Sequence, residues 1–230
     1  MELGRSDLAY FSKDFINFFA ELKKNNNREW FLQNKERYIY SVKIPFELFV
    51  QEIIHRIQEE DDTIQITAKE ALFRIYRDVR FSKDKSPYKT FASAIISHKG
   101  RKDLYLPGFY FEFDDAEIRI YNGAYFLDKN QLYKARKSIQ QNLSEFNSLI
   151  SEKNFKSKFG LTLGDKNKII PKEFQETYKI QPLIANKEFY YQAKLKSSNI
   201  LSKNPVDKML DYYLTARDIN YFFIDAINSK

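Results

Sequence analysis

The sequence predicts an α+β fold, a single domain over residues 1–230 with a central antiparallel sheet at about residues 70–125 packed by N-terminal and C-terminal helices. Three observations support this fold class. Only six glycines and six prolines are present, which disfavours a turn-rich all-β protein. Apolar residues recur at helical spacing towards both ends of the chain, whereas in the middle they alternate with polar residues. With 43% hydrophobic and 17% aromatic residues, the chain can bury a full core.

Three helices are predicted at the N-terminal end. The first spans 12–24, where five apolar side chains share one face. The second follows the capping residue Asn27 and runs over 28–42. Pro45 opens the third helix, which ends in an acidic run that we interpret as a solvated turn.

The middle of the chain predicts strands. Residues 72–81 alternate as a half-buried strand does, apart from Arg77 on the apolar side. Further strands are expected at roughly 91–98, 105–114 and 116–122, with a hairpin turn at Asp114-Asp115.

Helices return in the C-terminal part. Asp128 and Gln131 form a capping box for a helix that we expect to continue through Phe146. Residues 151–200 show no clear pattern. Pro205 opens the last helical region, which we expect a cap at Asp218 to divide in two.

The positive charge of the chain is concentrated in one stretch. Residues 72–102 contain nine basic and only two acidic side chains, an excess equal to the net charge of +7 for the whole chain. A clustered positive field holds phosphates or carboxylates better than scattered charges do. The sequence therefore predicts an anion site in this stretch, which we call the basic motif.

Alternation places Arg74, Tyr76, Asp78 and Arg80 on one face of the predicted strand. The following segment, 81–90, has the composition of a loop that could surround a phosphate with lysines and hydroxyl groups. The candidate ligand-binding residues are Arg74, Tyr76, Arg77, Arg80, Lys83, Lys85, Ser86, Tyr88 and Lys89.

Three functional hypotheses follow for the basic motif. The first is binding of a small phosphorylated or carboxylated ligand, with Glu112 or Asp78 as a base if the site is catalytic. The second is a nucleic-acid-binding module, because basic and aromatic residues alternate. The third is a structural or partner-binding domain in which Asp78 and Asp84 pair with the arginines. No catalytic residue is identified, and the sequence leaves open whether the protein is an enzyme.

Other groups of residues give weaker signals. We interpret the segment from Asn25 to Phe31 as a helix–helix turn with a capping asparagine and a core tryptophan, rather than as the rim of a ligand site. Glu112 and Glu117 could oppose each other across the hairpin as an acid–base pair or metal ligands. Of the two histidines, His98 is a better candidate proton carrier than His55, because it lies within the basic stretch.

Several classes of site are excluded or unsupported. Without cysteine there is no disulfide and no thiolate chemistry, and two histidines cannot make a histidine-rich metal site. No phosphate-loop or nucleophile-elbow motif is present, and we expect no metal or cofactor. The start of the chain lacks the features of a signal peptide, and no apolar run approaches the ~20 residues of a membrane span. We expect a cytoplasmic protein without a membrane partner.

The basic motif also resembles a known family. Residues 74–90, together with 25–31, 107–111 and 121–124, resemble the domain of unknown function 2461 family of uncharacterised, mainly bacterial proteins. Residues 171–174 resemble a further family signature, but Glu173 stands where the family has glycine. The resemblance covers nearly the whole chain and implies a single α+β domain. It implies no established activity, cofactor or catalytic residue.

Overall fold

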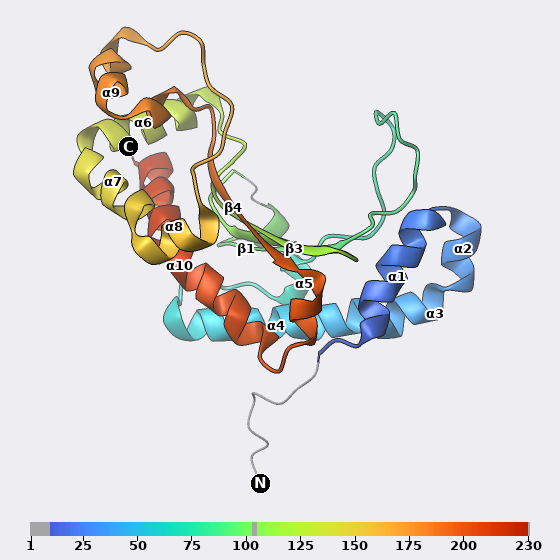
Figure 1. Cartoon of the computed structure of the whole chain (residues 1–230). Coiled ribbons are helices and arrows are strands. Elements are labelled where there is room, and N and C mark those ends of the chain that lie inside the picture. The colour runs from blue at the N-terminus through green and yellow to red at the C-terminus, as the bar shows by residue number, and fades with distance from the viewer. Residues whose placement is uncertain (1–9, 103–104, 230) are drawn as a thin grey trace. The chain divides into compact units, whose positions relative to one another are not determined.

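The computed structural model describes residues 10–102 and 105–229 (Figure 1). Four strands form one antiparallel sheet in the order β1-β2-β3-β4. They are β1 (Ala92–Ile96), β2 (Phe109–Phe113), β3 (Glu117–Ala124) and β4 (Phe189–Lys196). The α+β class is confirmed. The predicted extent of the sheet was wrong at both ends, because regular pairing begins only at Ala92 and the fourth strand lies far beyond residue 125.

The chain contacts divide the molecule into two compact units. Unit 1 comprises residues 10–101, 110–119 and 194–210, and unit 2 comprises 102, 105–109, 120–193 and 211–229. Strands β2, β3 and β4 contribute residues to both units, as does the last helix, α10 (Pro205–Asn228). The single-domain boundaries of 1–230 stay a prediction.

Unit 1 contains the N-terminal helices. They are α1 (Lys13–Lys24), α2 (Arg28–Gln33), α3 (Lys35–Arg37), a π-helix η2 (Tyr38–Lys43), α4 (Ile44–Glu60) and α5 (Ala68–Ala71). Unit 1 also contains the 3-10 turns η3 (Gly100–Lys102, which ends in unit 2) and η6 (Ser197–Leu201). Phe15, Phe46 and Phe49 pack against Phe113 of β2 with ring centroids 5.4 to 6.4 Å apart. The N-terminal helices therefore cover the strand residues of this unit, as predicted.

The second predicted helix, 28–42, was wrong in its continuity. Asn34 interrupts it, and its side-chain amide donates to the carbonyl of Trp30 (2.9 Å). The chain then turns through three α-helical residues into the π-helix, which runs directly into α4. π-Helical segments are rare and are frequently found at functional sites, and no side-chain periodicity predicts them.

Unit 2 contains the C-terminal helices. They are α6 (Lys129–Gln141), α7 (Leu143–Ser151), α8 (Lys153–Phe159), η4 (Lys172–Phe174), α9 (Gln175–Ile180) and η5 (Pro182–Ala185). Phe223 of α10 stacks on Phe189 of β4 (5.2 Å) and contacts Phe146 of α7 (6.1 Å). The predicted capping box of Asp128 and Gln131 is present.

Two helix predictions in the C-terminal part were wrong. The helix that starts after Asp128 ends at Asn142 instead of continuing through Phe146. α10 continues without a break through Asp218, whose carboxylate lies near its neighbour Arg217 (3.5 Å) instead of capping a new helix. Aspartate at a solvated helix position needs no break, so its capping propensity alone was a poor signal.

The end of β3 is a close contact point within unit 2. Gly123 has φ +92°, and a Cβ atom placed on it would lie 2.3 Å from the carbonyl oxygen of Phe189. The Asn220 side chain of α10 accepts from the Gly123 N–H (2.7 Å) and donates to Asn122 (3.1 Å). The glycine is therefore required by backbone conformation and by space together.

None of the helices in the described part of the chain combines the length and the hydropathy that crossing a bilayer requires. The cytoplasmic location stays a prediction.

Candidate functional site

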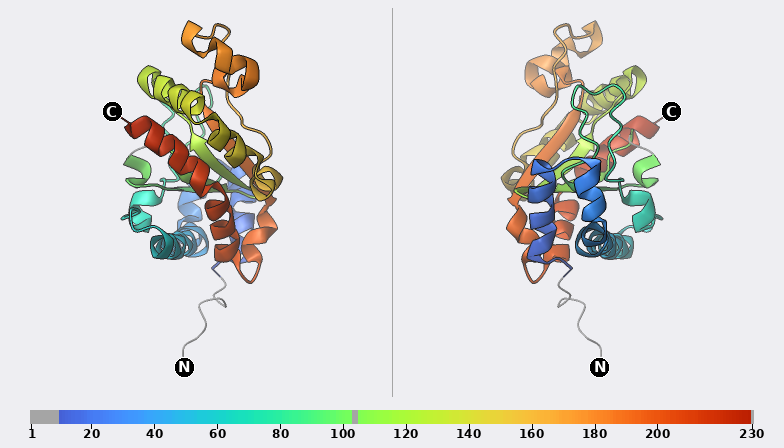
Figure 2. Two further views of the ribbon diagram at one scale, coloured as in Figure 1. Left: turned by 90° about the vertical axis from the view of Figure 1, so that its left-hand side faces the viewer. Right: turned by 90° about the vertical axis from the view of Figure 1, so that its right-hand side faces the viewer.

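Residues 72–90 of the basic motif form a projecting segment of unit 1, which we call the arm. The arm is a narrow pair of extended segments that stands above α1 and α2 (Figures 1 and 2). Two isolated bridges hold it, Leu72 to Ala94 and Tyr76 to Tyr88. The predicted regular strand over 72–81 was therefore wrong, because its partner segment contributes few backbone bonds; Pro87, for example, has no N–H to donate.

The predicted alternation of faces is present despite the irregular pairing. Arg74, Tyr76, Asp78 and Arg80 are all exposed, whereas Ile75 between them is buried. The backbone bonds that keep this register run from Lys89 N–H to Ile75 carbonyl (2.7 Å) and from Arg77 N–H to Pro87 carbonyl (2.9 Å).

Arg77 connects the two segments of the outer half of the arm through side-chain hydrogen bonds. Its guanidinium donates to the carboxylate of Asp84, to the Ser86 carbonyl (3.2 Å) and to the Ser82 hydroxyl (3.4 Å). Asp84 also accepts from the hydroxyl (2.6 Å) and the backbone N–H (2.9 Å) of Ser86. The Ser86 hydroxyl, its N–H and then Arg77 hold the pKa of Asp84 well below its usual range.

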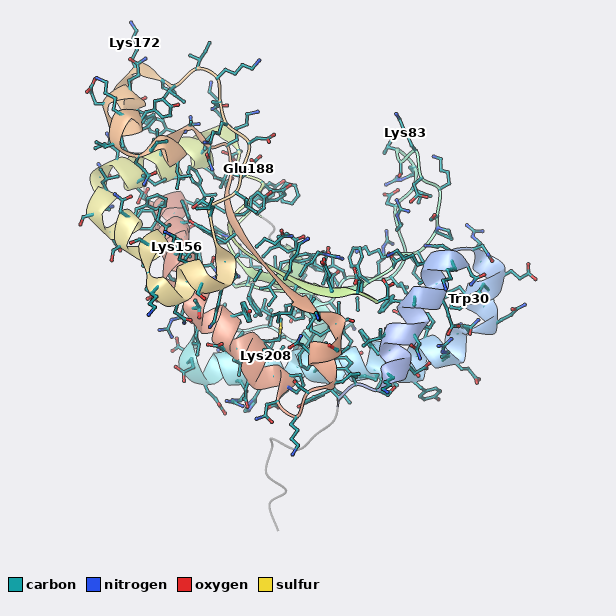
Figure 3. The ribbon with its side chains drawn as sticks, viewed as in Figure 1. Trp30, Lys83, Lys156, Lys172, Glu188 and Lys208 are labelled. Atoms are coloured by element: carbon teal, nitrogen blue, oxygen red, sulfur yellow. The ribbon has the colours of Figure 1, made fainter. Side chains whose placement is uncertain are left out.

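The free end of the arm carries the remaining predicted cations. Arg80 pairs with Asp78 (2.7 Å), and this bond lowers the pKa of Asp78 to about 2. Lys85 donates to the carbonyl of Val79 (2.9 Å) and so closes the loop. Lys83 projects from the tip of the arm (Figure 3) and has no ion pair within the described residues.

Tyr88 joins the arm to the helices. The Asn26 side chain donates to the Tyr88 carbonyl (2.9 Å) and accepts from the Tyr88 N–H (3.1 Å), in the manner of a neighbouring strand. The Tyr88 ring stacks on Phe31 at 4.0 Å and is only 4% exposed. Asn27 caps α2 by accepting from the Trp30 N–H (3.0 Å), as the turn interpretation of this segment expects. The core position expected for the tryptophan was wrong, because Trp30 is half-buried and Phe31 is the buried ring of α2.

A cavity of about 510 Å³ lies at the root of the arm within unit 1. Two groups of elements line it. The first, which we call the helical wall, comprises α1, α2, α3, the π-helix and the start of α4. The second, which we call the arm wall, comprises α5, residues 72–76 of the arm, residues 91–92 and Arg101. We call it the arm-root cavity. Its volume is typical of small-molecule sites, which span about 300–1,000 Å³.

The charged lining of the arm-root cavity is strongly asymmetric. Five cations of the described chain line it against one carboxylate; they are Lys35, Lys43, Lys69, Arg74 and Arg101, with Glu47 as the acid. Arg101 donates to the backbone carbonyls of Lys69 (2.9 Å) and Leu72 and so fixes the root of the arm. The other four cations form no ion pair with any described residue.

Aromatic side chains make up much of the remaining lining. They are Phe19, Phe31, Tyr38, Phe46, Phe73, Tyr76 and Phe91. Tyr76, at 52% exposed, presents more of its ring to solvent than the buried phenylalanines of the helical wall. Burial, followed by the proximity of Tyr76, raises the pKa of Tyr38 to about 12, so its phenol stays a proton donor at neutral pH.

Lys89 does not line the cavity but contacts two rings that do. Its ammonium stands over the rings of Phe73 (5.0 Å) and Phe91 (5.9 Å). Burial lowers its pKa, Glu112 opposes that effect, and Arg74 adds to it. Lys89 therefore packs against the aromatic lining of the arm-root cavity without being part of that lining.

The predicted acidic cluster of the hairpin converges on an arginine. Arg119 donates to Glu112 (2.7 Å) and Asp114 (2.6 Å), and Glu117 lies 3.8 Å away. Burial opposes the charge of Asp114, but backbone N–H groups and Arg119 outweigh it and lower the pKa. Within residues 10–102 and 105–229, no group of His, Asp and Glu side chains could hold a metal ion. These carboxylates therefore form an ion-pair network around Arg119.

The two histidines lie outside the arm-root cavity. His98 Nε2 is 3.1 Å from the hydroxyl of Thr63, and His55 lies 3.6 Å from Glu59 on the same helix. Neither histidine is placed to move a proton in that cavity.

The structure brings together only part of the predicted site. Arg74 and Tyr76 line the arm-root cavity. Arg77 and Tyr88 line a second cavity of about 320 Å³ together with Arg28, and Tyr76 borders this cavity as well. The remaining predicted residues line neither cavity; they are Arg80, Lys83, Lys85, Ser86 and Lys89.

Sequence reasoning missed Lys35, Lys43, Glu47 and Lys69, and did not single out Arg101 within the basic stretch as a site residue. The first two are eight residues apart, which corresponds to about 80° around a regular α-helix, so their spacing gave only a weak signal for a shared helix face. Nothing local could have paired that face with the root of the arm.

Comparison with known proteins identifies the family. The family model described as conserved hypothetical protein (DUF2461) matches residues 14–222, so the chain belongs to this family. The searches of curated proteins and of solved structures gave no match. The matched region includes the whole arm and the whole lining of the arm-root cavity.

Proposed function

We propose that this member of the domain of unknown function 2461 family binds a small anionic ligand, carrying phosphate or carboxylate, in the arm-root cavity. The observation that carries the proposal is the charged lining, in which five cations share one cavity with a single carboxylate among the described residues. Like charges gathered around a cavity repel one another, and an anion is the partner that relieves this repulsion.

Arg74 is the expected anchor. It lies on the exposed face of the arm, lines the cavity and has no carboxylate partner among the described residues. Its planar guanidinium can grip a phosphate or carboxylate through two parallel hydrogen bonds, whereas lysines act as mobile point charges. Lys35 and Lys43 would neutralise the ligand from the helical wall, and Lys69 from the arm wall.

The outer half of the arm has a structural role in this proposal and does not bind the ligand. Arg77, Asp84 and Ser86 form a closed network, which agrees with the structural hypothesis for these residues. The candidate bases Asp78 and Glu112 bind Arg80 and Arg119 and do not line the cavity. The proposal is therefore for binding, and it assigns no reaction.

Calorimetric titration with inorganic phosphate, pyrophosphate and citrate tests the proposal. Arg74→Gln should weaken binding about 10- to 150-fold, from the roughly 1.5–3 kcal/mol of a hydrogen bond to a charged group. Arg80→Gln is the matched control, since Arg80 lies on the same face of the arm outside the cavity. Equal loss in both variants, or no binding of any anion to the wild type, would refute the cavity as an anion site.

Binding of nucleic acid is a second candidate, favoured by one observation at the tip of the arm. Phe81 is 97% exposed, with the Arg80 guanidinium 5.9 Å from its ring centre and Lys83 two residues away. An exposed ring beside cations suits base stacking with phosphate contacts. Oligonucleotide binding that weakens steeply with salt and is lost in Phe81→Ala would support this candidate, whereas salt-insensitive binding would oppose it.

A further inference from the structure

We infer that the ligand of the arm-root cavity is a nucleoside phosphate. This inference rests on the proposed function and adds the class of ligand. The cavity offers three kinds of surface together, namely aromatic rings, one carboxylate and several unpaired cations. A nucleoside phosphate carries the three complementary groups in one molecule: a planar base, hydroxyl donors and a charged phosphate.

The aromatic lining fits the base. Seven of the described lining residues are aromatic, and they stand on both walls of the cavity. The rings on the arm wall are the more accessible ones, above all Tyr76 at 52% exposed, so a planar group can lie against them without disturbing the core. Base–aromatic stacking is favourable for every base, because each has a π-face.

The carboxylate fits the ribose. Glu47 is half-buried at the start of α4 and forms no ion pair with any described residue. An ionised carboxylate only accepts hydrogen bonds, and it repels a bound anion. An anionic ligand that also brings hydrogen-bond donors to this carboxylate is therefore favoured over one that brings none. The 2′- and 3′-hydroxyls of ribose are such donors, and nucleotide-binding proteins use acidic side chains to bind them.

The cations fit the phosphates. Lys35 and Lys43 come from the helical wall, and Lys69 and Arg74 from the arm wall, so positive charge reaches the cavity from two sides. No glycine-rich phosphate loop is present in the sequence, so these side chains would supply the phosphate contacts. The cavity volume of about 510 Å³ is sufficient for a ligand of this size.

The same three surfaces argue against simpler anions. A sugar phosphate would leave the aromatic walls in water, and an aromatic polycarboxylate would bring no donor to Glu47. Inorganic phosphate would use the cations alone. The inference therefore predicts that removing the base or the ribose hydroxyls from the ligand weakens binding.

The experiment is calorimetric titration of the full chain with ADP and UDP. It compares them with 2′,3′-dideoxy-ADP, ribose 5-phosphate, pyrophosphate and benzene-1,2,4-tricarboxylate. The variants are Tyr76→Leu and Glu47→Ala. Their matched controls are Tyr40→Leu and Glu36→Ala, which alter exposed residues of the π-helix and α3 outside the cavity lining. Circular dichroism spectra and urea midpoints of each variant establish that it is folded.

We expect ADP or UDP to bind at least 10-fold more tightly than pyrophosphate or ribose 5-phosphate. Tyr76→Leu should weaken nucleotide binding roughly 5- to 150-fold, the range of one stacked base, and leave pyrophosphate binding unchanged. The dideoxy ligand should bind at least 5-fold more weakly than ADP to the wild type and equally to Glu47→Ala, because the lost contact is the same one.

Three results would contradict the inference, and they can be told apart. If pyrophosphate or the tricarboxylate binds as tightly as the nucleotides, and Arg74→Gln removes that binding, the proposed anion site stands and the nucleoside assignment is refuted. If none of the ligands binds to the folded wild-type chain, the proposed function and the inference fail together. Equal effects of Tyr40→Leu and Tyr76→Leu also count against the cavity as the place of the base.

Discussion

Three consecutive asparagines in unit 1 have three different structural roles, and their alanine variants should separate these roles by stability. Asn25 donates from an exposed position to the carbonyl of Glu21 (3.0 Å), and Asn27 caps α2. Asn26 makes two hydrogen bonds to the backbone of Tyr88, a residue that is only 4% exposed. The three side chains are chemically identical, so differences among the variants report on position alone.

The expected magnitudes follow from these contacts. Asn26→Ala removes two hydrogen bonds of about 0.5–1.5 kcal/mol each and leaves a buried donor and acceptor unpaired, for a loss of roughly 2–3 kcal/mol in the free energy of unfolding. Asn27→Ala should cost about 1 kcal/mol, the usual value of an N-cap. Asn25→Ala should stay within about 0.5 kcal/mol of the wild type, as exposed substitutions do.

Urea unfolding, monitored by circular dichroism, gives the free energy of unfolding of each variant and so ranks the three by stability. Native-state hydrogen exchange adds a local reading, since the Tyr88 amide should lose protection in Asn26→Ala and keep it in Asn25→Ala. If Asn26→Ala is no more destabilising than Asn25→Ala, or if the Tyr88 amide exchanges alike in both, the attachment of the arm through Asn26 is refuted.

Two further predictions concern stability. Gly123→Ala should destabilise the chain by more than about 2 kcal/mol, because its φ of +92° and the Phe189 carbonyl oxygen 2.3 Å from a Cβ atom both oppose a side chain; thermal unfolding measures this, and a change under 0.5 kcal/mol would contradict it. Hydrogen bonds from Arg37 lower the pKa of Asp14 and Glu21 in the folded state, so their stabilisation is present above the unfolded pKa near 4 and lost as pH falls through the lowered values. Both carboxylates are more than a third exposed, so Arg37→Met should remove only roughly 1 kcal/mol at pH 7 and flatten the dependence of the urea midpoint between about pH 5 and 2; an unchanged slope would count against this assignment.

The elements with strong local signals were predictable. The caps at Asn27 and Asp128 and the hairpin turn at Asp114 depend on side chains that bind backbone N–H groups within three residues. The start of α4 depends on Pro45, whose fixed φ suits the first turn of a helix. The alternation of exposed and buried residues along the arm also followed from its own sequence.

Elements that depend on distant partners were not predictable in the same way. β4 lies in a segment with no clear pattern, and its place beside β3 is set by pairing across the sheet. The π-helix over Tyr38–Lys43 has a wider turn than an α-helix, and no local sequence pattern indicates it, so the predicted continuous helix was wrong there.

The sequence by itself determined that this chain is an α+β protein of its family and that its positive charge is concentrated around residues 72–102. Only the tertiary structure decided which cations share a cavity. Arg77 and Arg80 form ion pairs with carboxylates of the arm itself. Lys35 and Lys43 lie outside the basic motif in sequence, but they line the arm-root cavity together with Arg74. Charge density along a chain is a local property, whereas a binding site depends on side chains far apart in sequence that packing brings together around one space.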